Sequence, residues 1–133
     1  MRASVVGILM IVMASFLPVA HADMNPNESQ SDLNEVFGNL SKEKAKAKAQ
    51  EMAEKDFAKN SFRIFVAGMR RQQDVHDNYL KEKYGVMVTP IAGCVVSEGI
   101  MGAIEGYNLT MKPLLNRKFG HDIFKEAEEA ARR

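Results

Sequence analysis

Two adjacent arginines offer the clearest ligand-binding chemistry in this sequence. Arg70 and Arg71 are followed by two glutamines and then by a segment with helical character. Guanidinium groups bind carboxylates and phosphates through paired hydrogen bonds, and the N–H groups at a helix start add to anion binding. The pair therefore predicts a site for a small anionic ligand. The alternative is that both arginines are solvated and lie beside the carboxylates of Asp74 and Asp77.

The single cysteine offers a second kind of chemistry. Cys94 and Ser97 have the spacing of a one-cysteine thiol-exchange motif, and Glu98 follows directly. A cysteine at a helix N-terminus favours the thiolate, which is the nucleophilic form. However, the chain has no second cysteine to act as a resolving thiol, and the flanking valines favour a buried thiol that packs as a small apolar residue. An intermolecular disulfide is a further alternative.

Metal and cofactor chemistry find no support in the sequence. Only two histidines, His76 and His121, follow the first 22 residues, and their wide separation matches no metal-ligand spacing. Neither can be placed beside a cysteine nucleophile. Gly99, Gly102 and Gly106 do not form a dinucleotide-binding fingerprint, because they lie within a helical pattern. We therefore expect no cofactor and no metal.

Two predicted strands would bring the candidate residues to one edge of a sheet. Residues 62–67 and 86–89 are rich in β-branched and aromatic side chains. Pro90 interrupts the second run, because proline lacks the backbone N–H that a central strand requires. A helix within residues 70–83, stopped by Gly85, connects them. Such a unit places the strands parallel, so both following loops leave the edge where open α/β folds bind ligands. The candidate site at this edge comprises Arg70, Arg71, Cys94, Ser97 and Glu98.

Two helices are predicted before the first strand. Asp32, with Glu35 three residues later, resembles a helix N-cap, and Gly38 keeps this helix short. Ser41 caps a second helix that runs to about Lys59 and is rich in strong helix formers. Its narrow apolar stripe consists mainly of alanines, which is typical of a surface helix that packs on the core through small side chains.

A long helical pattern follows the second strand. It starts at residue 93 or 94 and runs to about residue 111, with three glycines along one side that predict close approach of another backbone. Pro113 should break or kink this helix about one turn earlier, because its ring clashes with a carbonyl of the preceding turn. The apolar pattern continues to Gly120, after which Asp122 can cap a last helix.

The order of these elements predicts a small, helix-rich α/β domain over residues 32–133. Two short parallel strands are marginal on their own, so the helices that cover them must supply most of the buried area. The first strand is nearly continuously apolar, which fits a strand covered on both faces. Because period alone does not assign short apolar runs, an all-α fold with residues 62–69 as a buried helical turn stays open.

The N-terminal segment predicts export. Arg2, the apolar run from Val5 to Leu17 and the triplet from Ala20 to Ala22 have the order of a cleavable signal peptide. The apolar run is shorter than the roughly 20 residues that span a bilayer as a helix. The polar residues 23–31 are expected to form a flexible leader. We therefore expect a periplasmic or secreted chain without stable membrane insertion.

The charge balance narrows the choice of partners. The chain has 18 Lys and Arg residues against 17 Asp and Glu residues, and without Arg2 the two classes are equal. A neutral chain gives no electrostatic case for nucleic acid or an anionic membrane as the partner. The leading interpretation is an exported, non-enzymatic accessory or binding protein for a protein partner or a small anionic ligand. The alternative is a thiol-dependent enzyme or thiol-exchange protein centred on Cys94.

Overall fold

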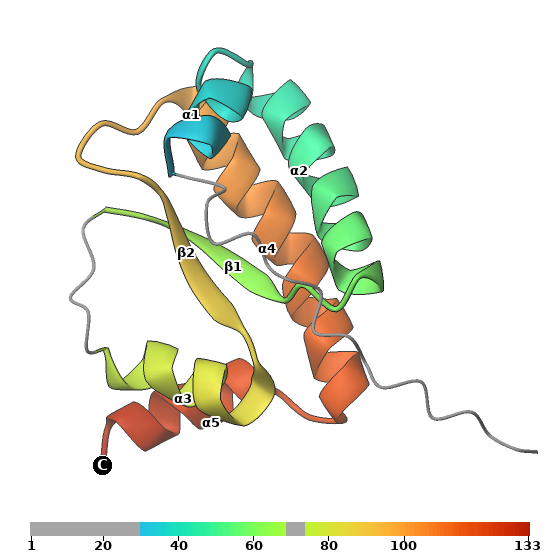
Figure 1. Ribbon diagram of the computed structural model, residues 1–133, viewed down its shortest axis with the longest axis vertical. Helices are drawn as coiled ribbons and strands as arrows, with labels where there is room; N and C mark the ends of the chain where they lie inside the picture. Colours follow the sequence, from blue (N-terminus) through green and yellow to red (C-terminus); the bar gives the residue numbers. More distant parts are fainter. Residues whose placement is uncertain (1–29, 69–73) are drawn as a thin grey trace, which may run out of the picture.

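A computed structural model describes residues 30–68 and 74–133 and shows the predicted order of elements (Figure 1). Strand pairing excludes the all-α alternative, and the fold is a helix-rich α/β arrangement with one parallel sheet of two strands. Among the described residues, no helix combines the length and apolar character that a bilayer crossing requires. The elements are α1 (Gln30–Gly38), α2 (Lys42–Ala58), β1 (Arg63–Ala67), α3 (Val75–Tyr84), β2 (Met87–Ala92), α4 (Glu98–Phe119) and α5 (Ile123–Ala131).

The second strand continues through its proline, contrary to the sequence prediction. Val66 of β1 pairs with Pro90 of β2 within the parallel ladder. The N–H of Met87 donates to the carbonyl of Phe62, so alternate N–H groups of β2 point toward β1. The position of Pro90 therefore faces the opposite edge of β2. A proline is tolerated there because its missing N–H is not part of the ladder.

A side chain of α4 satisfies the other edge of the sheet. Asn108 Oδ1 accepts a hydrogen bond from the N–H of Phe65 at 2.8 Å, and Asn108 Nδ2 donates to the carbonyl of Phe65 at 2.8 Å. The amide thus takes the place of one residue of a third strand and pairs two backbone groups. The neighbouring Tyr107 stacks on the ring of Phe65, with 3.8 Å between the centroids. Together these contacts fix β1 against α4.

The middle of β1 is covered on both faces. Ile64 and Phe65 are buried, and successive residues of a strand point to opposite faces. Val66 is half-buried and Ala67 is exposed, so the strand leaves the core at its C-terminal end. The prediction of a doubly covered strand is therefore confirmed for Ile64 and Phe65 and wrong at the exposed Ala67.

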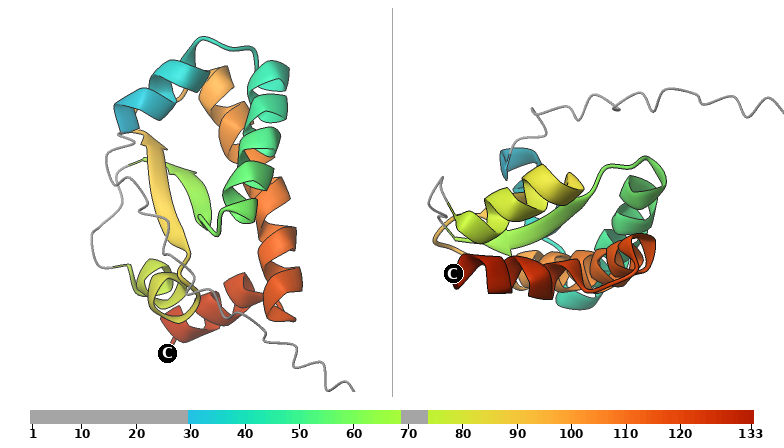
Figure 2. Two further views of the ribbon diagram at one scale, coloured as in Figure 1. Left: turned by 45° about the vertical axis from the view of Figure 1, so that its right-hand side comes forward. Right: turned by 90° about the horizontal axis from the view of Figure 1, so that it is seen from below.

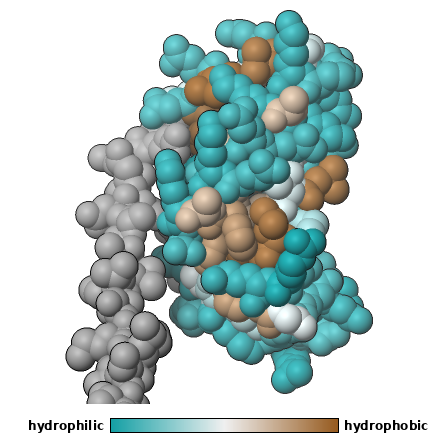
Figure 3. All heavy atoms as spheres, turned by 90° about the vertical axis from the view of Figure 1, so that its right-hand side faces the viewer, coloured by the Kyte–Doolittle hydropathy of each residue, from teal (hydrophilic) through white to brown (hydrophobic). Residues whose placement is uncertain are grey.

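Helices α2 and α4 run side by side and in the same direction, in contact through their smallest residues (Figure 2). A Cβ at Gly102 would lie 2.3 Å from the carbonyl oxygen of Lys42, and one at Gly106 would lie 2.3 Å from that of Lys46. The predicted close backbone approach is thereby confirmed. The alanine stripe of α2 is fully buried at Ala45, Ala49 and Ala53. The molecular surface on this side is mostly hydrophilic, with a few apolar patches (Figure 3).

Helices α1 and α3 begin at residues other than those predicted. α1 starts at Gln30, so the last two residues of the predicted leader are helical, whereas the signal peptide and the rest of the leader lie outside the described residues. α3 starts at Val75, where Asp74 is the N-cap and accepts a hydrogen bond from the N–H of His76. As predicted, α2 has Ser41 as its N-cap and α3 ends at Gly85 in the left-handed conformation.

α4 starts later and continues further than the sequence predicts. Ser97 is its N-cap, and the Oγ atom of Ser97 accepts a hydrogen bond from the N–H of Ile100 at 3.3 Å. The helix then continues through Pro113 to Phe119. Pro113 is exposed, whereas Met111 and Leu115 on either side are fully buried. Core packing before and after the proline therefore outweighs its unfavourable effect on the helix.

A charged network lies at the junction of α2, β1 and α4. Asp56 Oδ2 accepts hydrogen bonds from Arg63 Nη2 and from the hydroxyl of Tyr107, each at 2.6 Å. The side chains of Arg63 and Asp56 are only 12% and 15% exposed. Burial, together with the hydrogen bond to Asp56, raises the pKa of Tyr107 far above its ordinary value. The network therefore joins three elements through groups that are largely removed from water.

Candidate functional site

The predicted edge exists, because both strands end side by side. The N–H of Gly68 donates to the carbonyl of Ala92 at 2.9 Å, so the chain leaves β1 and β2 at the same edge of the sheet. Arg70 and Arg71 lie outside the described residues. The remaining candidate residues, Cys94, Ser97 and Glu98, lie in the loop that follows β2 and in the first turn of α4.

Ser97 and Glu98 have roles at the helix start. Ser97 caps α4, and Glu98 is exposed in the first turn, where a negative charge interacts favourably with the helix dipole. Helix capping and the helix dipole therefore account for a serine at position 97 and a glutamate at position 98. Their position still places them next to the loop formed by residues 93–96, which we call the β2–α4 loop.

Cys94 is exposed, contrary to the expected buried thiol. It lies three residues before the N-cap, so it does not occupy the helix N-terminus that the sequence predicts. Val95 is 85% exposed, and Val96 is exposed as well. The flanking valines would indicate a buried Cys94 only if the backbone ran through the core at this point. Here the chain has already left the sheet, so Cys94 and the valines are exposed. The loop therefore presents a thiol and two valines to solvent.

A groove of about 440 Å³ lies between α1 and the β2–α4 loop. Most of its side chains are polar and come from α1 and the residue that follows it. Val95 and Ser97 form the loop side. The groove is lined by Ser31, Asn34, Glu35, Gly38, Asn39, Val95 and Ser97. Hydrogen-bonding groups thus lie directly beside the exposed Val95.

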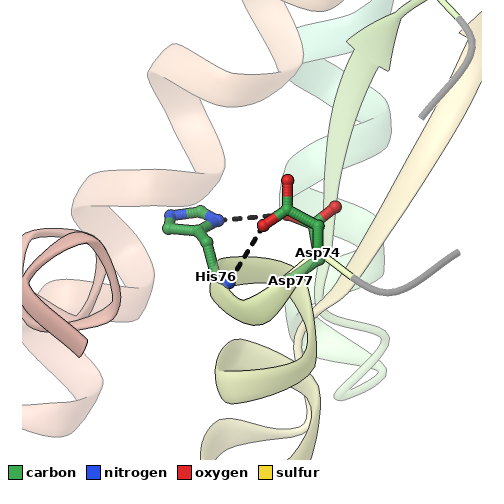
Figure 4. Close-up of side chains that lie close together, drawn as sticks. All are labelled: Asp74, His76 and Asp77. Carbon is green, nitrogen blue, oxygen red and sulfur yellow. Dashed lines mark hydrogen bonds and ion pairs between the residues drawn. The ribbon is translucent and has the colours of Figure 1, made fainter. Parts of the chain in front are cut away.

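Three potential metal ligands meet at the start of α3 (Figure 4). One ligand atom each from Asp74, His76 and Asp77 lies within 4.8 Å of the others, and His76 Nδ1 is 3.0 Å from Asp77 Oδ1. An imidazole with two carboxylates is a donor set that suits a divalent cation. The sequence prediction found no ligand spacing among the histidines and the cysteine and no zinc or calcium loop, and it did not single out this group of one histidine and two aspartates. The same contacts also serve helix capping, since Asp74 accepts from the His76 N–H at 2.9 Å.

A second polar cluster fastens α5 to α3. The carboxylate of Glu126 accepts hydrogen bonds from Lys83, Tyr79, Tyr84 and His121, with the hydroxyl of Tyr84 at 2.7 Å. The hydrogen bonds from Lys83 and the two tyrosines hold the pKa of Glu126 well below its ordinary value. Sequence reasoning missed this cluster, because its members lie up to 47 residues apart.

The chain matches no protein-family model, no curated protein and no solved structure. Among the described residues, two large exposed apolar side chains, Val95 and Val96, are adjacent in the β2–α4 loop, and two more, Met101 and Leu109, lie about two turns apart on α4. The clusters around Asp74 and Glu126, in contrast, consist of groups that bond to one another.

Replacing Glu126 by glutamine should lower the melting temperature at pH 7 and flatten its dependence on acid pH. The pKa of Glu126 is depressed in the folded protein, so its stabilisation is present above the unfolded pKa of about 4.3 and disappears as pH falls below that value. Thermal unfolding between pH 7 and pH 2 measures both effects. Glu129→Gln on the same helix is the control, and equal shifts in the two variants would show that the cluster does not fasten α5.

Proposed function

We propose that this protein is an exported, non-enzymatic binding protein that recognises a protein partner through the β2–α4 loop. The observation that carries the proposal is the exposure of Val95, which is 85% accessible and has exposed neighbours on both sides. Adjacent exposed apolar side chains mark contact surfaces on soluble domains. Fully burying one such side chain in a partner's pocket would contribute about 1.5–3 kcal/mol.

The loop has the support that a recognition element needs. Ile91 and Ala92 precede it and are fully buried, and Ser97 follows it as the cap of α4. Binding residues commonly lie on loops that a rigid scaffold positions in this way. The polar groove beside Val95 supplies hydrogen-bonding groups around an apolar centre, which is the usual composition of a protein interface.

Protein contact is better supported than anion binding. The anionic-ligand interpretation depends on Arg70 and Arg71, which lie outside the described residues. Export follows from the signal-like order of the first 22 residues, and the balanced charge of the remaining chain argues against nucleic acid or an anionic membrane. These points favour a protein partner in the periplasm or outside the cell.

The exposure of Cys94 favours a second candidate function, thiol exchange with a partner. An exposed thiol can attack a partner's disulfide to form a mixed disulfide and release the partner's other sulfur as a thiolate. Since this chain has one cysteine, an external thiol would have to resolve the mixed disulfide. This function would depend on the sulfur of Cys94, whereas recognition through Val95 would not.

A photo-cross-linking amino acid at position 95 tests the proposed function in the cells that naturally produce the protein. We expect a discrete adduct with another protein from position 95 and none from position 75, because Val75 is 57% exposed but lies on α3. After mass spectrometry identifies the partner, Val95→Asp should raise the dissociation constant of the purified pair at least about tenfold. Val75→Asp should leave this constant unchanged.

The same experiment in a Cys94→Ser background separates the two functions. Retention of the adduct and of the affinity supports recognition through the loop, whereas their loss in Cys94→Ser supports thiol exchange. Equal adducts from positions 75 and 95, or none from either, would contradict a recognition role for the β2–α4 loop.

A further inference from the structure

Four side chains with oxygen or nitrogen donors converge where α5 packs on α3, at the end of the molecule opposite α1 (Figure 1). Two are phenols of α3, one is the imidazole that precedes α5, and one is a carboxylate of α5. The carboxylate accepts a hydrogen bond from each of the other three. We call this group the α3–α5 cluster, and its residues are Tyr79, Tyr84, His121 and Glu126.

Three of the four donor groups form a tight triangle. Tyr84 Oη is 2.7 Å from Glu126 Oε2 and 2.9 Å from His121 Nε2, and this nitrogen is 2.5 Å from the same carboxylate oxygen. Metal–ligand bonds of about 2.0–2.1 Å place neighbouring donors of an octahedral site roughly 2.8–3.0 Å apart. The three atoms therefore lie close to the spacing of one face of an octahedral metal site.

The orientation of His121 directs a lone pair into this triangle. Its Nδ1 atom lies 3.1 Å from the carbonyl oxygen of Phe119, which can only accept, so Nδ1 carries the proton of the neutral ring. Nε2 then faces Glu126 Oε2 with a lone pair, and the one hydroxyl proton of Tyr84 can serve only one of these two atoms. Two lone pairs at 2.5 Å require a cation beside them, which is either a second proton on the imidazole or a metal ion. A backbone carbonyl that holds the far ring nitrogen is also the usual support of a metal-bound histidine.

We propose that the α3–α5 cluster binds a ferric ion. Two phenolates and one carboxylate supply three negative charges, which balance the charge of Fe³⁺, and the imidazole supplies a neutral fourth ligand. Phenolate and carboxylate oxygens are hard donors, and the cluster contains no thiolate or thioether that would select a soft metal. Each coordinating tyrosine releases its hydroxyl proton to solvent on binding, and solvent fills the remaining coordination positions.

The cluster is open to solvent on one side and supported on the other. The side chains of His121 and Glu126 are 49% and 26% exposed, so an ion can reach them. The ring of Tyr84 packs on Phe119, with 4.7 Å between the centroids, and this contact fixes the direction of its hydroxyl. The amine of Lys83 also pairs with Glu126, but its side chain is half exposed. Lys83 can therefore turn into solvent when the ion takes its place beside the carboxylate.

The ion site does not rest on the function proposed for the β2–α4 loop. That loop lies beside α1, whereas the α3–α5 cluster lies at the other end of the molecule (Figure 1). The two proposals also involve different residues. A chain that gives the cross-link from position 95 and binds no iron would contradict only the ion site, and the reverse result would contradict only the role of the loop.

Titration of the purified chain, as the producing cell processes it, with ferric nitrilotriacetate tests the site. We expect a visible absorption band from phenolate-to-iron charge transfer that saturates at one ion per chain, together with a rise in melting temperature. The double variant Tyr79→Phe, Tyr84→Phe should abolish the band, because it removes both phenol oxygens and keeps both rings. Tyr107→Phe is the matched control and should leave the band unchanged, since Tyr107 is the remaining tyrosine of the chain and bonds to Asp56. Circular dichroism confirms that each variant is folded.

A pair of histidine variants tests the nitrogen ligand. His121→Ala should raise the dissociation constant for iron, measured by competition with nitrilotriacetate, at least about tenfold. His76→Ala removes the imidazole beside Asp74 and Asp77 and should leave this constant unchanged. The absence of a band and of a change in melting temperature at about 1 mM ferric chelate would overturn the proposal, as would a band that survives the double tyrosine variant. Displacement of the iron by an equal concentration of Zn²⁺ would overturn the assignment to a ferric ion.

Discussion

Replacing Gly102 by alanine should destabilise the protein by about 2–3 kcal/mol, although alanine is the better helix former by about 1 kcal/mol. The added Cβ would lie 2.3 Å from the carbonyl oxygen of Lys42 and within 3.1 Å of two further backbone atoms of that residue. Backbone atoms cannot rotate aside as a flexible side chain can. α2 would have to move away from α4, which would open the contact that buries Ala45.

Gly38→Ala is the matched control for this prediction. Gly38 is also helical, but a Cβ there would meet only the side-chain oxygen of Asn34 at 3.1 Å, and that side chain can rotate. Denaturant unfolding should therefore show a loss of stability for Gly102→Ala and little change or a gain for Gly38→Ala. A Gly102→Ala variant as stable as the wild type would contradict the close approach of α2 and α4.

Local sequence signals identified most of the helix ends and the class of the fold. Ser41, Asp122, Gly85 and Gly120 each act through a hydrogen bond or a backbone conformation within one turn of a helix end. Such signals can be read without knowledge of the rest of the chain. The parallel pairing of the strands was also predictable, because a connecting helix leaves little choice of topology.

Tertiary context decided the features that were predicted wrongly. β2 is not interrupted at Pro90, which faces the outer edge of the strand, and α4 is not broken at Pro113, which lies between buried turns of the helix. The exposure of Cys94 depends on where the chain leaves the sheet, which its apolar neighbours do not reveal. The residue type sets the local conformational preference, and tertiary packing determines whether the native structure follows that preference.

The polar contacts between distant segments could not be predicted from the single sequence. Asn108 bonds to Phe65 across 43 positions, and Glu126 bonds to groups of α3. Such partners become neighbours only after the helices have packed. The cluster at Asp74, His76 and Asp77 was different, because its members fall within one turn and a search that included carboxylates would have found it.

Replacing Asp56 by asparagine should reduce the free energy of unfolding by about 3 kcal/mol, which is a large part of the stability of a small domain. The substitution keeps the shape of the side chain and removes the negative charge that faces the guanidinium of Arg63 at 2.6 Å. Because both side chains are largely removed from water, solvent cannot replace the lost charge. The effect should appear in denaturant unfolding at neutral pH.

Two comparisons separate the charge from the hydrogen bonds in this network. Tyr107→Phe removes one donor to Asp56 and leaves the ion pair, so it should cost only about 1 kcal/mol. Glu51→Gln removes an ion pair with Lys55 in which the two side chains are 65% and 66% exposed, and it should produce no measurable change. If Asp56→Asn costs no more than Tyr107→Phe, the network is fastened by its hydrogen bonds, and the buried charge of Asp56 has no separate role in joining α2 to β1.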